Sequence, residues 1–166
     1  KALEQSLKSF MYVIFGFYPT PNVMAGITQY LTQKDAGFRL LADYGQSHNA
    51  ASLAAMSKIL RLRPGSVRLI SGPNETPWKE GQRHNSHEKN HNKIVLGKRG
   101  GATIAGGSGS TNESQNAFFK SFENRVWFLS NNPIDAVYVA LFDEITNALW
   151  DLGFEPDFSE FEDSKS

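Results

Sequence analysis

The chain has 166 residues, which is the length of one domain and is enough to bury a hydrophobic core. Its 17 basic and 17 acidic residues balance, so the overall charge does not indicate a nucleic-acid partner. The absence of cysteine excludes disulfide bonds and thiolate metal sites, and no apolar run is long enough to span a membrane.

Charge is unevenly distributed along the chain. Much of the positive charge lies between residues 58 and 99, whereas Glu155–Asp163 is acidic. We therefore expect one domain over residues 1–152 and an acidic tail over residues 153–166. No signal peptide is visible, so we expect a soluble, cytoplasmic protein if no removed signal peptide precedes Lys1.

The first half of the chain predicts alternating helices and strands. Apolar residues at helical spacing (Ala2, Leu3, Leu7 and Phe10) predict a leading helix. An apolar run before Pro19 predicts a buried strand, and Asn22 is a candidate N-cap for the helix that follows. The predicted elements are the strand Met11–Tyr18, the strand Phe38–Ala42, the helix Asn49–Leu62 and the strand Val67–Ile70.

The second half begins with a stretch, 71–90, that lacks periodicity and predicts a long surface loop. Two strands, His91–Leu96 and Ala102–Ala105, are predicted to form a hairpin through the glycine-rich segment 97–101. A further strand, Asn124–Leu129, precedes an amphipathic helix that opens at Pro133 and runs through Leu149. Two apolar helical stripes are expected to be core: Leu53, Met56 and Leu60; and Val137, Leu141, Ile145 and Leu149.

Strands separated by helices favour an α/β sandwich with a mixed central sheet. Within it, His91 and Lys93 are two residues apart on a predicted strand, so their side chains can meet one ligand on the same face. A neutral imidazole can attack phosphorus, and an ammonium can hold phosphate oxygens. The segment Gly109–Asn112 adds small donors and close backbone approach, while Glu123 can orient the imidazole. These are the parts of a metal-free site that cleaves phosphodiesters through a covalent histidine intermediate.

Two other interpretations of these residues are possible. His84, His87 and His91 have a spacing that zinc ligands on a helix can have, but no cysteine or nearby aspartate completes the set, so we expect no metal. The run Gly106–Ser110 is either a flexible turn or a phosphate-binding loop, and we favour the second.

The three motifs, taken in order, resemble those of one half-unit of the phospholipase D superfamily, and within it the small bacterial nucleases. The family's His-x-Lys stands here as His91–Lys93, its Gly-Ser-x-Asn as Gly109–Asn112, and its later Glu-Asn as Glu123–Asn124. The similarity extends to Ala36–Asp43, which resembles the family's second strand, and to a closing helix after Asn131. It spans about residues 2–150.

The chain departs from the family pattern at one position of the signature. The family has an aspartate five residues after the motif lysine, where this chain has Lys98. The hairpin before Gly109 also looks several residues longer. The departure bears first on structural support and on the electrostatics of the phosphate site, and Lys98 is a candidate additional phosphate contact.

The resemblance implies a two-step mechanism without metal or other cofactor. His91 would attack phosphorus and form a phosphohistidine, and a second histidine would protonate the leaving oxygen and then activate water. Glu123 would fix the tautomer of His91. Because the chain carries one His-x-Lys, either two copies pair about a two-fold axis or a second half-unit lies in a longer protein. The residues implied to bind the phosphate oxygens are Lys93, Gly109, Ser110 and Asn112.

Three functions remain open, of which a nuclease acting on DNA or RNA is favoured. The residues that could contact nucleic acid are Arg83, His84, Lys89 and Lys98, and Trp78 could stack on a base. A phospholipase or phosphatidyl transferase is the second interpretation, although only Trp78 and Phe118–Phe119 offer an apolar rim. A catalytically inactive half-unit used for dimerisation is the third, and the missing aspartate supports it.

Overall fold

The computed structural model describes residues 9–14, 16–33, 36–47, 49–70, 90–110, 113–114 and 124–156. The strands are β1 (Ser9–Ile14), β2 (Phe17–Tyr18), β3 (Gly37–Asp43), β4 (Val67–Ile70), β5 (Lys93–Arg99), β6 (Ala102–Gly109), β7 (Glu113–Ser114) and β8 (Arg125–Leu129). The helices are α2 (Pro21–Leu31), α3 (Tyr44–Ser47), α4 (Ala50–Leu62) and α6 (Pro133–Leu152).

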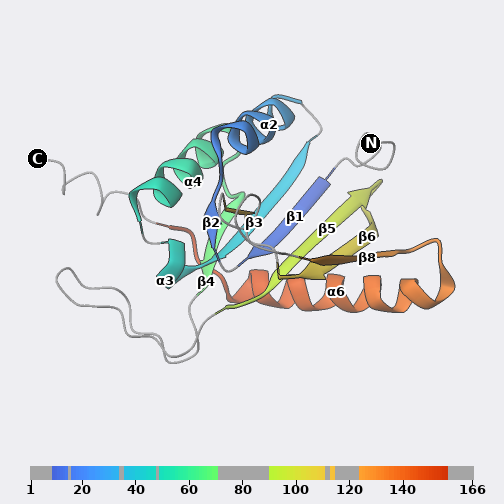
Figure 1. The fold of residues 1–166 in the computed structure, drawn as a ribbon. Helices are drawn as coiled ribbons and strands as arrows, with labels where there is room; N and C mark the ends of the chain where they lie inside the picture. The colour runs from blue at the N-terminus through green and yellow to red at the C-terminus, as the bar shows by residue number, and fades with distance from the viewer. Residues whose placement is uncertain are drawn as a thin grey trace, which may run out of the picture.

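Six of these strands form one mixed sheet in the order β4–β3–β1–β5–β6–β8, and β2 pairs with β7 apart from it. Strands β1 and β4 lie parallel to β3, whereas β5, β6 and β8 are each antiparallel to the strand before them in the sheet. Figure 1 shows α2 and α4 on one face of the sheet and α6 across the other. The predicted α/β fold with a mixed sheet between helices is confirmed.

The hydrophobic core lies in two parts because the central strand β1 is buried on both faces. Successive side chains of a strand point to opposite faces, so Ile14 packs toward α2 and α4 while Val13 packs toward α6. Met56 and Ile59 of α4 fill the first part, as the predicted stripe on that helix requires. Trp150 of α6 fills the second part.

The helix starts follow local capping chemistry. The side chain of Asn49 accepts a hydrogen bond from the Ser52 N–H at 3.0 Å and caps α4, close to the predicted start. The predicted cap of α2 at Asn22 is wrong, because the Thr20 side chain accepts from the Val23 N–H and Pro21 occupies the first turn. The Thr-Pro pair was the stronger start signal.

Several predicted strand limits change. The single strand expected over Met11–Tyr18 is two strands, β1 and β2, and Phe10 lies in β1 rather than in a leading helix. The rest of that predicted helix lies outside the described residues, as does most of the loop predicted over 71–90. The hairpin turn is confined to Gly100 and Gly101, which both adopt positive φ angles of 58° and 81°.

The outer surface of α6 contradicts the expectation that its apolar stripe is core for Val137, Leu141 and Ile145, whereas Leu149 packs against the second part of the core as predicted. Ile134 is 74% exposed and Leu152 is 73% exposed, and Val137, Leu141 and Ile145 are exposed as well. The helix instead buries another face against the sheet, formed by Val139, Phe142, Thr146 and Trp150. We call the exposed line the α6 outer stripe; it consists of Ile134, Tyr138, Leu141, Ile145, Ala148 and Leu152.

No helix in the described part of the chain combines the length and the apolar composition that a membrane crossing needs.

Candidate active site

The sheet topology gathers the predicted motifs at one edge. Strand β1 ends at Ile14, which is paired with Lys93 at the start of β5. Strand β6 ends beside that position, and Gly109 at its end is paired with Arg125 at the start of β8. The His-x-Lys and Gly-Ser segments, with Lys93 and Gly109 16 residues apart in sequence, therefore lie side by side at the same edge (Figure 1).

The side chains of His91 and Lys93 lie in contact, although the strand predicted to begin at His91 begins at Lys93. His91 is exposed and lies just before β5, whereas Lys93 is only 6% exposed. The Lys93 Nζ lies 3.2 Å from Nδ1 and 3.3 Å from Nε2 of His91, and it donates to the His91 carbonyl at 3.0 Å. An ammonium has only donors, so the ring nitrogen that it contacts must present a lone pair. Either neutral tautomer satisfies this arrangement, since the two ring distances are nearly equal.

Lys93 lies on the face of the sheet opposite α6. Ile94 and Leu96 of β5 pack with Trp150 of α6. Because successive side chains of a strand point to opposite faces, Lys93 points to the face away from α6. Gly109 of β6 lies next to Lys93 in the neighbouring strand, and Arg125 of β8 lies next to Gly109.

Gly109 and Ser110 are fixed by the segment before β8. The Ser110 N–H donates to the Asn124 carbonyl at 3.0 Å, and the Asn124 N–H donates to Ser110 Oγ at 3.1 Å. A Cβ at Gly109 would lie 2.0 Å from the Asn124 oxygen and 2.7 Å from Arg125 Cα. Glycine is therefore required at 109 by the close approach of two backbones. The exposed Ser110 hydroxyl, while it accepts from Asn124, retains a proton that can be donated to a ligand.

The glycine run before Ser110 is a strand, not a loop, because Gly106–Gly109 belong to β6. The small residues make room for neighbouring side chains. A Cβ at Gly106 would lie 3.0 Å from the Phe142 ring of α6, and a Cβ at Gly107 would lie 2.9 Å from the Trp127 ring on the other face.

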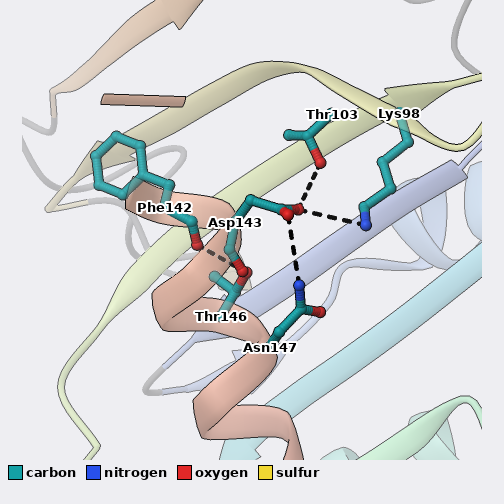
Figure 2. A network of polar contacts seen from close by, with 6 residues as sticks. All are labelled: Lys98, Thr103, Phe142, Asp143, Thr146 and Asn147. Atoms are coloured by element: carbon teal, nitrogen blue, oxygen red, sulfur yellow. Dashed lines mark hydrogen bonds and ion pairs between the residues drawn. The ribbon is translucent and has the colours of Figure 1, made fainter. Parts of the chain in front are cut away.

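Lys98 is not brought together with His91 and Lys93. Its Nζ lies 3.3 Å from Oδ1 of Asp143 on α6, on the opposite face of the sheet from Lys93. Figure 2 shows this carboxylate also accepting from the Thr103 hydroxyl and from the Asn147 side chain. The residue that departs from the family pattern is thus part of a polar network that joins β5 and β6 to α6.

The other predicted site residues lie outside the described residues. These are the second-motif residues Thr111 and Asn112, the carboxylate Glu123, and the predicted nucleic-acid contacts Arg83, His84 and Lys89. Two of the three histidines of the zinc interpretation also lie there. Among the residues that the structure does describe, no group of three His, Asp or Glu side chains is close enough to hold a metal ion.

Sequence reasoning missed two buried polar residues beside His91. Asp43, at the end of β3, accepts a hydrogen bond from the Asn90 N–H at 2.8 Å. The Asn90 side chain in turn accepts from the Asn92 side chain at 2.7 Å. The available signals were a carboxylate at the carboxyl end of a buried strand and an amide directly before the motif histidine.

The same carboxylate affects a neighbouring tyrosine. Burial, and then the charge of Asp43, raise the pKa of Tyr18 above its ordinary value of 10.0, while a hydrogen bond with Asn49 acts in the opposite direction. Tyr18 is therefore a neutral phenol at physiological pH, and its hydroxyl donates to the Gln46 carbonyl.

The order of the strands and the layers of helices on both faces of the sheet are similar to those of a solved phospholipase D family structure. Among solved structures, the chain is similar to Nuc, a phospholipase D family member from Salmonella typhimurium, with a TM-score of 0.60 and 18% identity over 93% of this chain and 86% of that chain. It is also similar to NucT from Helicobacter pylori, with a TM-score of 0.54 and 15% identity over 92% of this chain and 86% of that one.

Part of a larger protein has a similar fold. Polyphosphate kinase from Porphyromonas gingivalis matches 91% of this chain with 22% of its own, at a TM-score of 0.50 and 9% identity. No family profile matches the chain, and no curated protein matches its sequence. At these identities the likeness establishes the fold, and the predicted similarity to the phospholipase D superfamily is confirmed at that level.

Proposed function

We propose that this chain is a metal-independent phosphodiesterase that hydrolyses nucleic acid through a phosphohistidine at His91. The observation that carries the proposal is the position of the Lys93 ammonium, within 3.3 Å of both nitrogens of an exposed imidazole. A phosphate that reached this edge would meet a nucleophile, a cation and the Ser110 hydroxyl together. The similarity of the three sequence motifs to the phospholipase D superfamily supports the same chemistry.

The first step forms a bond between a His91 nitrogen and phosphorus. A non-bridging phosphate oxygen replaces the imidazole as the acceptor for Lys93, which releases the ring lone pair for attack. The bond from phosphorus to the leaving oxygen breaks as a second histidine transfers its proton to that oxygen. In the second step that histidine takes a proton from water, the hydroxide attacks phosphorus, and the N–P bond breaks to restore His91.

The second histidine would come from a second copy of the chain, so that two half-units form one site. The α6 outer stripe is a separate candidate surface for association of two copies; it lies on the opposite side of the sheet from Lys93, so a contact through it would not itself bring two His91 side chains together. Its members follow one another at spacings of four, three, four, three and four residues, which is the pattern of a seam between two helices. An exposed apolar surface of this length marks an interaction site. Since α6 contains no lysine or arginine, an anionic membrane is not a matched partner.

A nucleic-acid substrate is supported by Trp127 of β8. One face of its indole ring lies against Gly107, while the side chain remains 48% exposed on the face of the sheet that carries Lys93. The Arg125 guanidinium lies 6.0 Å from the ring centroid. An indole beside a guanidinium can stack on a base and hold a phosphate. From strand spacings, Trp127 is about 12 Å from Lys93, which is a distance that one or two nucleotides span.

The test measures cleavage of single-stranded DNA, double-stranded DNA and RNA, beside a small chromogenic phosphodiester, in excess EDTA. Wild type should cleave nucleic acid, and His91→Ala should reduce cleavage to background because the nucleophile is absent. Lys93→Ala should lower both affinity and rate. Lys98→Ala removes a lysine from the same strand but the opposite face, so it is the matched control and should retain activity.

Each alternative has its own outcome. Turnover by His91→Ala would remove the assignment of the nucleophile. Hydrolysis of the small diester without nucleic acid would favour a lipid substrate, and inhibition of wild type by EDTA would contradict metal independence. Absence of turnover by wild type would favour an inactive half-unit.

A further inference from the structure

Asp43 is a buried carboxylate that the proposed mechanism does not use. It is only 1% exposed at the end of β3, between the ends of β1 and β4. Burial of a charged group is unfavourable unless hydrogen bonds compensate for the lost water. Both of its oxygens accept from backbone: Oδ1 from the Asn90 N–H at 2.8 Å and Oδ2 from the Gln46 N–H at 3.0 Å. One side chain thus joins the start of α3 to the segment that enters β5.

The second link is Asn90, which is also buried. Its Nδ2 donates to the carbonyl of Ile14 at the end of β1, at 3.4 Å. Its Oδ1 accepts from both the backbone N–H and the side-chain Nδ2 of Asn92, at 3.4 and 2.7 Å. Asn90 therefore holds the residues on both sides of His91 and ties them to two central strands.

We infer that Asp43, acting through Asn90, is a positioning residue that sets where the His91 imidazole stands at the sheet edge. The backbone at residues 90 and 92 is fixed by this network, while the His91 side chain between them projects to the surface. The inference rests on the proposed function for its effect on catalysis. Attack on phosphorus needs the ring nitrogen close to van der Waals distance and in line, so a displaced backbone slows the reaction even when every reacting group is present.

The inference predicts different effects for two substitutions of Asp43, because they leave different hydrogen-bond acceptors. Asp43→Ala removes both acceptors. Asp43→Asn keeps one oxygen acceptor but turns an NH2 group toward the second backbone N–H, so one hydrogen bond is replaced by two opposed donors. Asn90→Ala leaves the backbone N–H bonded to Asp43 and removes only the links to Ile14 and Asn92.

The matched control is Asp143→Ala. Asp143 also accepts from several partners, namely Lys98, Thr103 and Asn147, but it does so on α6 at the opposite face of the sheet (Figure 2). A general loss of stability should appear in both alanine variants. A displaced His91 should appear only when Asp43 or Asn90 is changed.

The experiment measures kcat and KM for a nucleic-acid substrate at a temperature where every variant is folded. We expect kcat of Asp43→Ala to fall by about 10- to 100-fold with KM changed less than about threefold, because ground-state binding groups remain. Asp43→Asn should retain more activity than Asp43→Ala, and Asp143→Ala should stay within about twofold of wild type. Equal losses of kcat in the two alanine variants, or a normal kcat in Asp43→Ala, would overturn the inference.

A second measurement does not need activity. Hydrogen exchange at the Asn90 amide should accelerate by about tenfold or more in Asp43→Ala and remain near wild type in Asp143→Ala. If wild type hydrolyses no substrate, the proposed function fails, and this exchange still decides whether Asp43 holds the segment. Unchanged protection at Asn90 would overturn the inference on its own. If Asp43→Ala does not fold, Asn90→Ala and Asp43→Asn are compared with the same control.

Discussion

Gly109→Ala gives a stability prediction whose size follows from the contact between two backbones. The new Cβ would lie 2.0 Å from the Asn124 oxygen, and real Cβ contacts are not shorter than 3.0 Å, so the ends of β6 and β8 must separate by about 1 Å. Such overpacking costs about 1–3 kcal/mol. The two hydrogen bonds between Ser110 and Asn124 would be stretched as well, at about 1 kcal/mol each.

A total loss of about 3–5 kcal/mol is expected for Gly109→Ala, which lowers Tm by about 6–20 °C in a chain of this size. Gly26→Ala is the control, because Gly26 lies within α2 and nothing lies within 4 Å of its added Cβ. Replacing glycine inside a helix should instead stabilise the protein by about 0.5–1 kcal/mol. Thermal unfolding followed by circular dichroism measures both changes. A Tm of Gly109→Ala within about 2 °C of wild type would refute the reasoning.

Three other predictions concern association, substrate binding and pH. Leu141→Asp should convert a dimer into a monomer in light scattering, whereas Ala140→Asp, exposed beside the stripe, should remain dimeric; a wild type that is monomeric at micromolar concentration contradicts the pairing. Trp127→Ala should weaken binding of single-stranded DNA by about 1–3 kcal/mol in a fluorescence titration, and an unchanged affinity would exclude stacking. Because burial, and then Asp43, raise the pKa of Tyr18 above 10.0, the unfolded chain ionises first as pH rises above 10. Stability should therefore be lost as pH rises through the folded pKa, and Tyr18→Phe should reduce that loss; equal slopes in Tm against pH would contradict it.

The sequence predicted the elements whose signals are local. Strand β4 and helix α4 follow from an apolar run and from a cap at Asn49, so their limits agree with the prediction within one residue. The closeness of His91 and Lys93 also follows from their spacing in sequence, although His91 lies before β5 and not within it. Assembly of this pair with Gly109 and Ser110 depended on the resemblance in motif order, because strand pairing itself cannot be read from spacing.

The errors arise where a pattern identifies a surface but not its neighbour. An apolar stripe shows that a helix has one apolar face, but it does not show whether that face packs against the sheet of the same chain. Leu141 was therefore assigned to the core although it is exposed. The glycines of β6 were interpreted as a loop because the residues that require small side chains there, Phe142 and Trp127, lie far away in sequence. Asp43 was missed for the same reason, since its partner Asn90 lies 47 residues away.

The single bridge between Phe154 and Leu69 has a consequence for the resistance of the protein to aggregation. Beyond the helix, Phe154 exchanges two backbone hydrogen bonds with Leu69 at 2.8 and 2.9 Å, along the outer side of β4. An uncovered edge strand with the sequence Val-Arg-Leu-Ile would be a template for intermolecular strand pairing and fibre growth. Residues 153 and 154 therefore act as a cover for an aggregation-prone edge, so a chain shortened at residue 152 should fold yet precipitate.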